Sequence, residues 1–157
     1  MLRARQTSLP ELPVNTDQVL LVRASWPDAA ARADTLTSTF YEYLFEIDTS
    51  AAALFAGVDM AAQKKKLAQA LAVVVNAADD PGRLIPALTA LGRRHAGYRV
   101  EQRHFDSVGT ALLRALGATL GGAFTADVRD AWAAAYGAVS GIMRDAMAQG
   151  ATEKLAA

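Results

Sequence analysis

The side chains that could carry out chemistry are few in this chain, and His95 is the most informative of them. It is one of two histidines and ends an apolar series at helical spacing that comprises Leu84, Leu88 and Leu91. An imidazole can bind a metal through one ring nitrogen while the other donates a hydrogen bond, and the Leu91 carbonyl, four residues earlier, is a suitable acceptor. On these residues alone, His95 is either a metal ligand or a structural residue of its helix.

The composition excludes several other kinds of chemistry. The chain of 157 residues has no cysteine, which excludes disulfides, thiolate-bound metals, thiol catalysis and attachment of a cofactor through cysteine. It also has no G-x-S-x-G or Walker-type loop, so nothing points to a serine hydrolase or a nucleotide-binding enzyme. The 16 Lys and Arg residues balance 16 Asp and Glu residues, which argues against nucleic acid or an anionic membrane as the main partner. No apolar run is long enough for a membrane span and no secretion signal is present, so we expect a cytoplasmic protein.

The elements that must position His95 are predicted to be helices, because apolar residues recur at helical spacing in every long segment. The first helix begins at residues 15–16 and is ended or kinked by Pro27, and Asp28 then caps a helix that runs to Phe45. A short element over 50–55 ended by Gly57 follows, and then a helix capped by Asp59 that stops at the turn-forming residues 79–82. The remaining predicted elements are the helix that carries His95, a helix from Gly97 to Gly121 and a last helix capped by Thr125. No segment alternates as a strand does. The sequence therefore predicts one all-α domain of about seven helices over 15–150, with a flexible extension over 1–14 and a short tail over 151–157.

Four segments carry a family resemblance. They are FYEYLF at 40–45 followed by Phe55, DMAAQKKKL at 59–67, RH at 94–95 with VEQ at 100–102 and FDSVG at 105–109, and DAWAAAYG at 130–137. Each is moderately specific, but their order and spacing together resemble the globins over about residues 17–143, especially bacterial single-domain globins and the globin half of flavohaemoglobins. The resemblance implies a globin fold, a three-over-three sandwich of about seven helices, and a non-covalently bound haem b.

The resemblance also implies roles for individual residues around the haem. His95 is the proximal iron ligand, Phe55 packs against the porphyrin, and Val100 and Phe105 line the same site. Phe55 would equally suit an ordinary core position. Further candidates are Leu67 and Gln63, which share a helical face over the distal side, and Lys66 and Arg99, which could contact the haem propionates or remain solvated surface cations.

The distal pair is expected to be Tyr41 and Gln63, which match the distal tyrosine and glutamine of flavohaemoglobin-like globins. A diatomic ligand such as dioxygen gains partial negative charge at haem iron, so a phenol O–H and an amide N–H are suitable donors to it. A hydrogen bond to a charged group contributes about 1.5–3 kcal/mol, which would slow ligand release by about tenfold to several hundredfold for each donor. The alternative is that Tyr41 only satisfies a buried backbone group.

The remaining polar residues near the iron are expected to be few. The second histidine, His104, matches a position on the proximal-side helix, so we expect five-coordinate ferrous iron without a second histidine ligand. Tyr41 or a nearby lysine could still bind ferric iron. Where flavohaemoglobins place a tyrosine and a glutamate beside the proximal histidine, this chain has Phe105 and Met147, which should weaken electron donation by the histidine.

These expectations lead to a reversible binder of dioxygen, carbon monoxide and nitric oxide that acts in oxygen binding or delivery. Nitric oxide dioxygenation is chemically feasible if an external reductase supplies electrons. The alternatives are a haem-based gas sensor that signals through a separate partner, and a haem-free helical scaffold, against which the His95, Phe55 and Tyr41–Gln63 set argues. Both a monomer and a homodimer fit the sequence.

Overall fold

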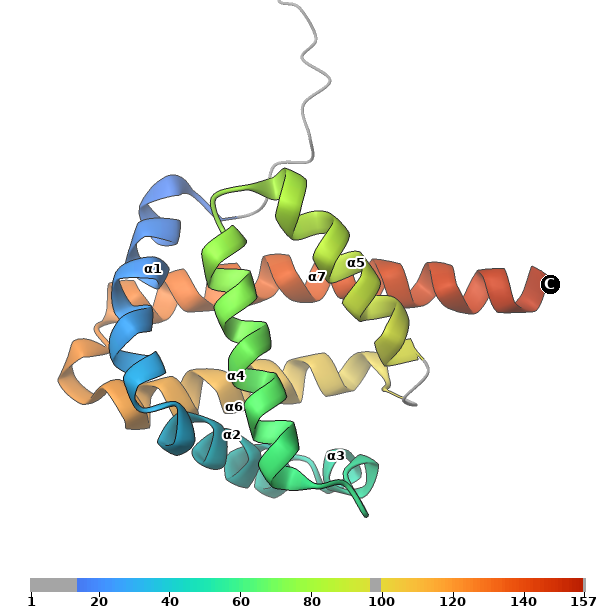
Figure 1. Ribbon diagram of the computed structural model, residues 1–157, viewed down its shortest axis with the longest axis horizontal. Coiled ribbons are helices and arrows are strands. Elements are labelled where there is room, and N and C mark those ends of the chain that lie inside the picture. The colour runs from blue at the N-terminus through green and yellow to red at the C-terminus, as the bar shows by residue number, and fades with distance from the viewer. Residues whose placement is uncertain (1–13, 97–99, 157) are drawn as a thin grey trace, which may run out of the picture.

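The computed structural model of the protein describes residues 14–96 and 100–156 (Figure 1). Within these residues every regular element is helical. The helices are α1 (Thr16–Ala31), α2 (Ala33–Ile47), α3 (Thr49–Leu54), α4 (Met60–Ala77), α5 (Pro81–Ala96), α6 (Gln102–Leu120) and α7 (Ala126–Ala156), with a short 3-10 helix, η1 (Gly121–Ala123), before α7. The predicted all-α class is confirmed, whereas the predicted extension over 1–14 lies almost wholly outside the described residues.

Several helices begin where capping side chains predict. The Asn15 side chain accepts a hydrogen bond from the Gln18 backbone N–H at 2.8 Å, and the Gln18 side chain accepts one from the Asn15 N–H at 3.1 Å. The Asp59 carboxylate accepts from two backbone N–H groups in the first turn of α4, and the Thr125 hydroxyl accepts from one in α7. These side chains satisfy backbone donors that have no partner within the helix, so they fix where each helix starts.

The prediction of a helix boundary at Pro27 and Asp28 is wrong. Helix α1 passes through Pro27 and ends at Ala31, and Asp28 is an exposed residue within it. Proline removes one backbone hydrogen bond, but Ala29 beyond it is fully buried, so packing of the last turn compensates for the loss. The chain turns instead at Arg32, whose Nη1 donates to the Thr119 carbonyl at 2.6 Å.

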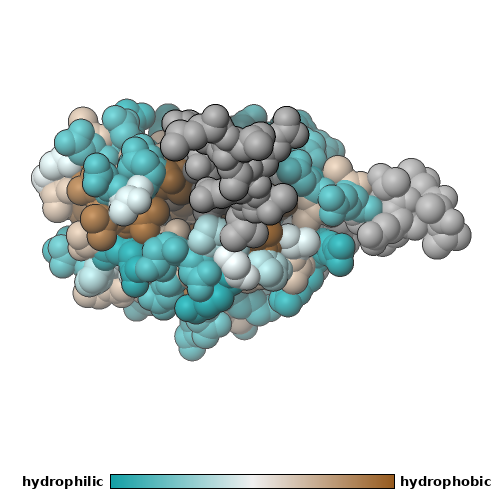
Figure 2. Space-filling view, turned by 90° about the horizontal axis from the view of Figure 1, so that it is seen from above, coloured by the Kyte–Doolittle hydropathy of each residue, from teal (hydrophilic) through white to brown (hydrophobic). Residues whose placement is uncertain are grey.

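The helices form two layers of three, with α1, α4 and α5 crossing α2, α6 and α7 (Figure 1). The most extensive packing is that of α5 on α7, α2 on α6 and α1 on α7, while α4 contacts α1, α2 and α5. This arrangement is the predicted three-over-three globin fold. The face shown in Figure 2 is largely hydrophilic, with smaller apolar areas between polar side chains. In the described part of the chain, no helix is both long enough and apolar enough to cross a bilayer.

The buried apolar side chains form two clusters. The larger one, the main core, joins α1, α2, α3, α4, α6 and α7 and includes Leu36, Leu44, Leu116 and Trp132. The smaller one, the second core, comprises Ala77, Leu84, Leu88, Phe105, Met143 and Met147. Because α5 contributes to the second core and packs mainly on α7, the position of His95 is set by that helix pair.

Candidate functional site

His95 lies in the last turn of α5 and is partly buried. Its Nδ1 lies 2.8 Å from the Leu91 carbonyl oxygen, so the predicted contact between these groups is present. A carbonyl can only accept, so Nδ1 carries the proton and Nε2 carries the lone pair of the neutral ring. His95 therefore has the tautomer and the fixed orientation that an Nε2 metal ligand requires.

Tyr41 and Gln63 are joined directly by a hydrogen bond. Tyr41 lies in α2 with only 4% of its surface exposed, and the Nε2 of Gln63 in α4 donates to its Oη at 3.1 Å. Burial raises the pKa of the Tyr41 phenol, although the hydrogen bond from Gln63 acts in the opposite direction. The phenol is consequently neutral at ordinary pH and keeps its proton for donation to another acceptor.

Aromatic rings hold Tyr41 in place. Phe40 and Phe55 meet its ring edge to face, with centroids 4.9 and 5.4 Å away, and Phe45 lies at 5.8 Å. Phe55 follows α3 directly, is partly buried, and also packs on Phe45 at 5.6 Å. These spacings are those of favourable aromatic pairs, so the rings restrict the orientation of the phenol.

Gln63 and His95 occupy corresponding places on two helices that diverge. The three residues 78–80 join α4 to α5, and the two helices separate from this turn (Figure 1). Gln63 precedes the end of α4 by as many residues as His95 follows the start of α5. Each residue is therefore about 21 Å along its helix from the turn, so the two residues lie at similar distances from it on the two diverging helices.

Four apolar side chains in α4, in α5 or close to these helices in the chain are only partly buried. Leu67 and Phe55 pack on the main core, and Leu91 and Val100 pack on the second core. A flat apolar group that contacted these side chains would remove their exposed surface from water, which favours its binding. The described residues include no cluster of His, Asp or Glu suited to a free metal ion, but one imidazole is enough for a metal whose other ligands arrive with the group. The residues present therefore fit haem.

The remaining predicted site residues divide into buried and exposed ones. Phe105 and Met147 are buried together in the second core. Neither residue therefore brings a polar side chain to this core. Lys66 is exposed on α4. Arg99 lies outside the described residues.

A polar network around His104 was not found from the sequence. The buried His104 accepts a hydrogen bond at Nδ1 from the Glu101 N–H at 2.8 Å, so its Nε2 carries the proton and donates to Ser50 Oγ at 3.0 Å. Ser50 and Ser107 in turn donate to the two oxygens of Asp48, with the Ser107 bond at 2.9 Å. Hydrogen bonds from Ser50 first and then Ser107 lower the pKa of Asp48 to about 2. The network ties α3 to α6, and its one sequence signal is an Asp immediately before the short helix.

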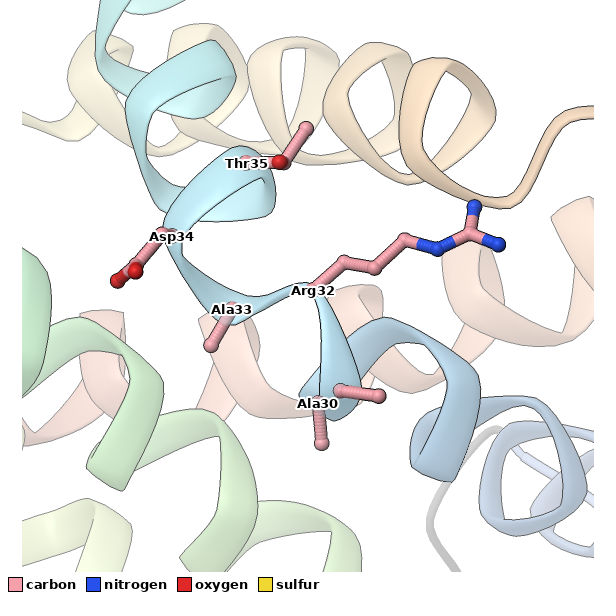
Figure 3. Close-up of a pocket in the computed structure, with 6 residues that line it drawn as sticks. Ala30, Arg32, Ala33, Asp34 and Thr35 are labelled. Atoms are coloured by element: carbon pink, nitrogen blue, oxygen red, sulfur yellow. The ribbon is translucent and has the colours of Figure 1, made fainter.

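A shallow surface hollow lies elsewhere, at the bend between α1 and α2, and is lined by residues 30–35 (Figure 3). One of its two charged side chains, Arg32, extends away from the bend towards the end of α6, where it donates to the Thr119 carbonyl. None of the candidate residues described above lines this hollow. It is therefore not the site.

Comparison with known proteins agrees with this geometry. The family model described as Globin matches residues 38–143, a range that contains Tyr41, Gln63 and His95. The flavohemoprotein of Rhodopirellula baltica is 32% identical over 126 residues, which cover 79% of this chain and 31% of that protein. The flavohemoprotein of Xylella fastidiosa (strain Temecula1) is 32% identical over 129 residues, which cover 81% of this chain and 32% of that protein. The flavohemoprotein of Chromobacterium violaceum is 34% identical over 119 residues, which cover 74% of this chain and 30% of that protein. This chain thus spans about a third of the length of these curated relatives. On the family match over most of its length, the chain belongs to the globin family.

Proposed function

We propose that this globin binds haem b non-covalently, with His95 as the proximal iron ligand, and reversibly binds dioxygen, carbon monoxide and nitric oxide. The observation that carries the proposal is the hydrogen bond between Gln63 and Tyr41, the two residues expected on the distal side. This hydrogen bond leaves the neutral Tyr41 phenol able to donate to a bound gas ligand, while Nδ1 of His95 is held by a backbone carbonyl. The flavohemoprotein relatives support the choice of cofactor.

On the distal side, each residue has a separate task. Haem supplies the iron at which diatomic gases coordinate. Tyr41 keeps its proton because burial raises its pKa, and its O–H donates to a ligand that gains negative charge. Gln63 occupies a lone pair of the Tyr41 oxygen, which directs the phenol proton elsewhere, and its second amide N–H can serve another acceptor. Phe55 and Leu67 contribute apolar walls that exclude water and strengthen these hydrogen bonds.

On the proximal side, the residues favour binding over oxygen activation. His95 donates from Nδ1 to the Leu91 carbonyl. A neutral carbonyl is a weaker acceptor than a carboxylate, so it draws the Nδ1 proton less strongly away from the ring. Phe105 and Met147 add no strong acceptor to this side. The ring therefore remains a neutral imidazole with modest electron donation, which disfavours O–O cleavage. Because both nitrogens of His104 are engaged in its own network, this second histidine would not bind the iron in competition with His95.

Nitric oxide dioxygenation is a further part of this proposal. It consumes electrons that an external reductase must supply. Stopped-flow mixing of the oxygenated protein with nitric oxide tests it directly. Stoichiometric formation of nitrate and ferric protein within the mixing time supports it, whereas simple displacement of dioxygen by nitric oxide contradicts it.

The proposed cofactor and ligand are tested by the spectra of the purified protein in its ferric, ferrous and carbonyl forms. We expect haem to bind with a high-spin ferrous spectrum, and His95→Ala to lose or displace it. The matched control is His104→Asn, which removes the other imidazole while keeping an acceptor for the Glu101 N–H, and it should retain the parental spectra. Unchanged spectra in His95→Ala, or a low-spin ferrous parent, would contradict the proposal.

A further inference from the structure

Arg144 on α7 is a charged residue held against the apolar proximal side. Its Nη2 forms an ion pair with Asp106 Oδ1 at 2.9 Å, and its guanidinium carbon lies 5.2 Å from the centre of the Phe105 ring. Its Nε is buried and has no hydrogen-bond acceptor among the described residues. A buried donor without a partner carries a free-energy cost that calls for an explanation.

The position of Arg144 connects it to the proximal helix. Gly92 of α5 lies directly on α7, because a Cβ built at this glycine would be 2.7 Å from the Met143 carbonyl oxygen and 2.9 Å from the Ala146 Cβ. Arg144 lies between these two α7 residues in the chain. His95 follows Gly92 by one helical turn, so Arg144 belongs to the α7 segment that supports the turn before His95.

The ion pair has a defined polarity. The Arg144 side chain is 33% exposed, whereas that of Asp106 is 83% exposed, so water screens the carboxylate more than the guanidinium. The positive end of the pair is thus directed at the Phe105 ring and the second core. The nearby Tyr136 responds to both charges: burial is the main reason why its pKa is raised, Arg144 lowers that pKa and Asp106 raises it. Both charges therefore act on buried groups in this region.

We propose that Arg144 is an electrostatic positioning residue, whose cation on the Phe105 ring weakens electron donation by His95 and raises the reduction potential of the haem. This inference rests on the proposed function, since it requires haem with His95 as its ligand. With haem bound at His95, a positive charge on the Phe105 side would favour the ferrous form, which is the form that binds gases reversibly.

The test is a mediated redox titration of the haem-loaded full-length protein, combined with the iron–histidine stretching frequency of the ferrous form. Arg144→Met keeps much of the side-chain length but removes the charge, so the midpoint potential should shift down and the stretching frequency up. Arg144→Lys keeps the charge and should stay near the parent. Asp106→Asn removes the compensating carboxylate and should shift the potential up. The matched control is Arg103→Met, because Arg103 lies on α6 within one turn of Asp106 but is paired with Glu101 and is 62% exposed.

Opposite shifts in Arg144→Met and Asp106→Asn support the proposal, because loss of packing alone would move both variants in the same direction. A haem-loaded Arg144→Met protein with the parental potential and frequency overturns it, as does an equal shift in Arg103→Met. If Arg144→Met does not fold, the sign of the Asp106→Asn shift decides. Failure of the parent itself to bind haem would refute the proposed function, which distinguishes that outcome from a failure confined to Arg144.

Discussion

The contact between α5 and α7 at Gly92 gives the sharpest prediction about the site. A Cβ at this position would lie 2.7 Å from the Met143 carbonyl oxygen, and 2.9 Å from both the Met143 Cα and the Ala146 Cβ. Non-bonded carbon atoms pack at about 3.5–4.0 Å. Two of the three opposing atoms belong to the backbone and cannot rotate away, so Gly92→Ala must push the two helices apart.

The size of this effect follows from two opposing contributions. Inserting a methyl group into a packed interface costs about 1–3 kcal/mol, and the upper part of the range applies because backbone atoms are involved. Alanine in place of a helical glycine stabilises by about 0.5–1 kcal/mol. The free energy of unfolding of Gly92→Ala should therefore fall by about 2 kcal/mol, which for a chain of this size lowers the midpoint temperature by about 4–8 °C.

Urea unfolding followed by circular dichroism measures this difference, with Gly141→Ala as the matched control. Gly141 lies on α7, two residues before Met143, and a Cβ there has no neighbour within 4 Å. The control should be stabilised by about 0.5–1 kcal/mol, because only the gain in helix propensity remains. In the haem-loaded protein, Gly92→Ala should also release haem faster, since His95 lies one turn beyond the displaced contact. A Gly92→Ala protein as stable as the parent would refute the close approach of these helices.

Three other substitutions test the distal pair, the polar network and the α6–α7 contact. Tyr41→Phe should speed dioxygen dissociation about tenfold or more in stopped-flow experiments, because it removes one charge-assisted donor, and should change carbon monoxide dissociation much less. Because the folded-state pKa of Asp48 is lowered to about 2, its carboxylate stabilises the fold above its ordinary pKa, and this contribution is lost as the pH falls from about 4 towards 2. Urea titrations should therefore show that Asp48→Asn loses less unfolding free energy over this pH range than the parent. Gly109→Ala would place a Cβ 2.6 Å from the Tyr136 ring, which must move and weaken its hydrogen bond to the Phe105 carbonyl, so thermal unfolding should occur at a lower temperature than in the parent.

The parts of the fold that could be predicted from the sequence depend on residues close together in the chain. Caps at Asn15, Asp59 and Thr125 act on backbone groups within the next turn, so the residues concerned are adjacent in the chain. The error at Pro27 has a different origin. The last turn of α1 persists because Ala29 is buried by residues distant in sequence, and a periodicity within α1 carries no information about that packing.

The same division between local and distant contacts applies to the candidate site. The contact of His95 with the Leu91 carbonyl was predictable because a helix fixes residues four positions apart. Gln63 and Tyr41 were each predicted to face a ligand, but their mutual hydrogen bond depends on how α2 meets α4. The pairing of Arg144 with Phe105 spans two helices and arises only from their packing.

The two sides of the site are supported by different parts of the molecule. Tyr41 and Phe55 belong to the main core, whereas Phe105 belongs to the second core, on which Arg144 acts from α7. Substitutions that share no contacts add in free energy to within about 0.5 kcal/mol. The effects of Tyr41→Phe and Arg144→Met on the free energy of dioxygen binding should therefore add in the double variant, since one removes a donor to the ligand and the other changes electron donation from the opposite side. Coupling well beyond that limit, measured from oxygen equilibria of the four proteins, would show that the two cores transmit strain to each other through the ligand site.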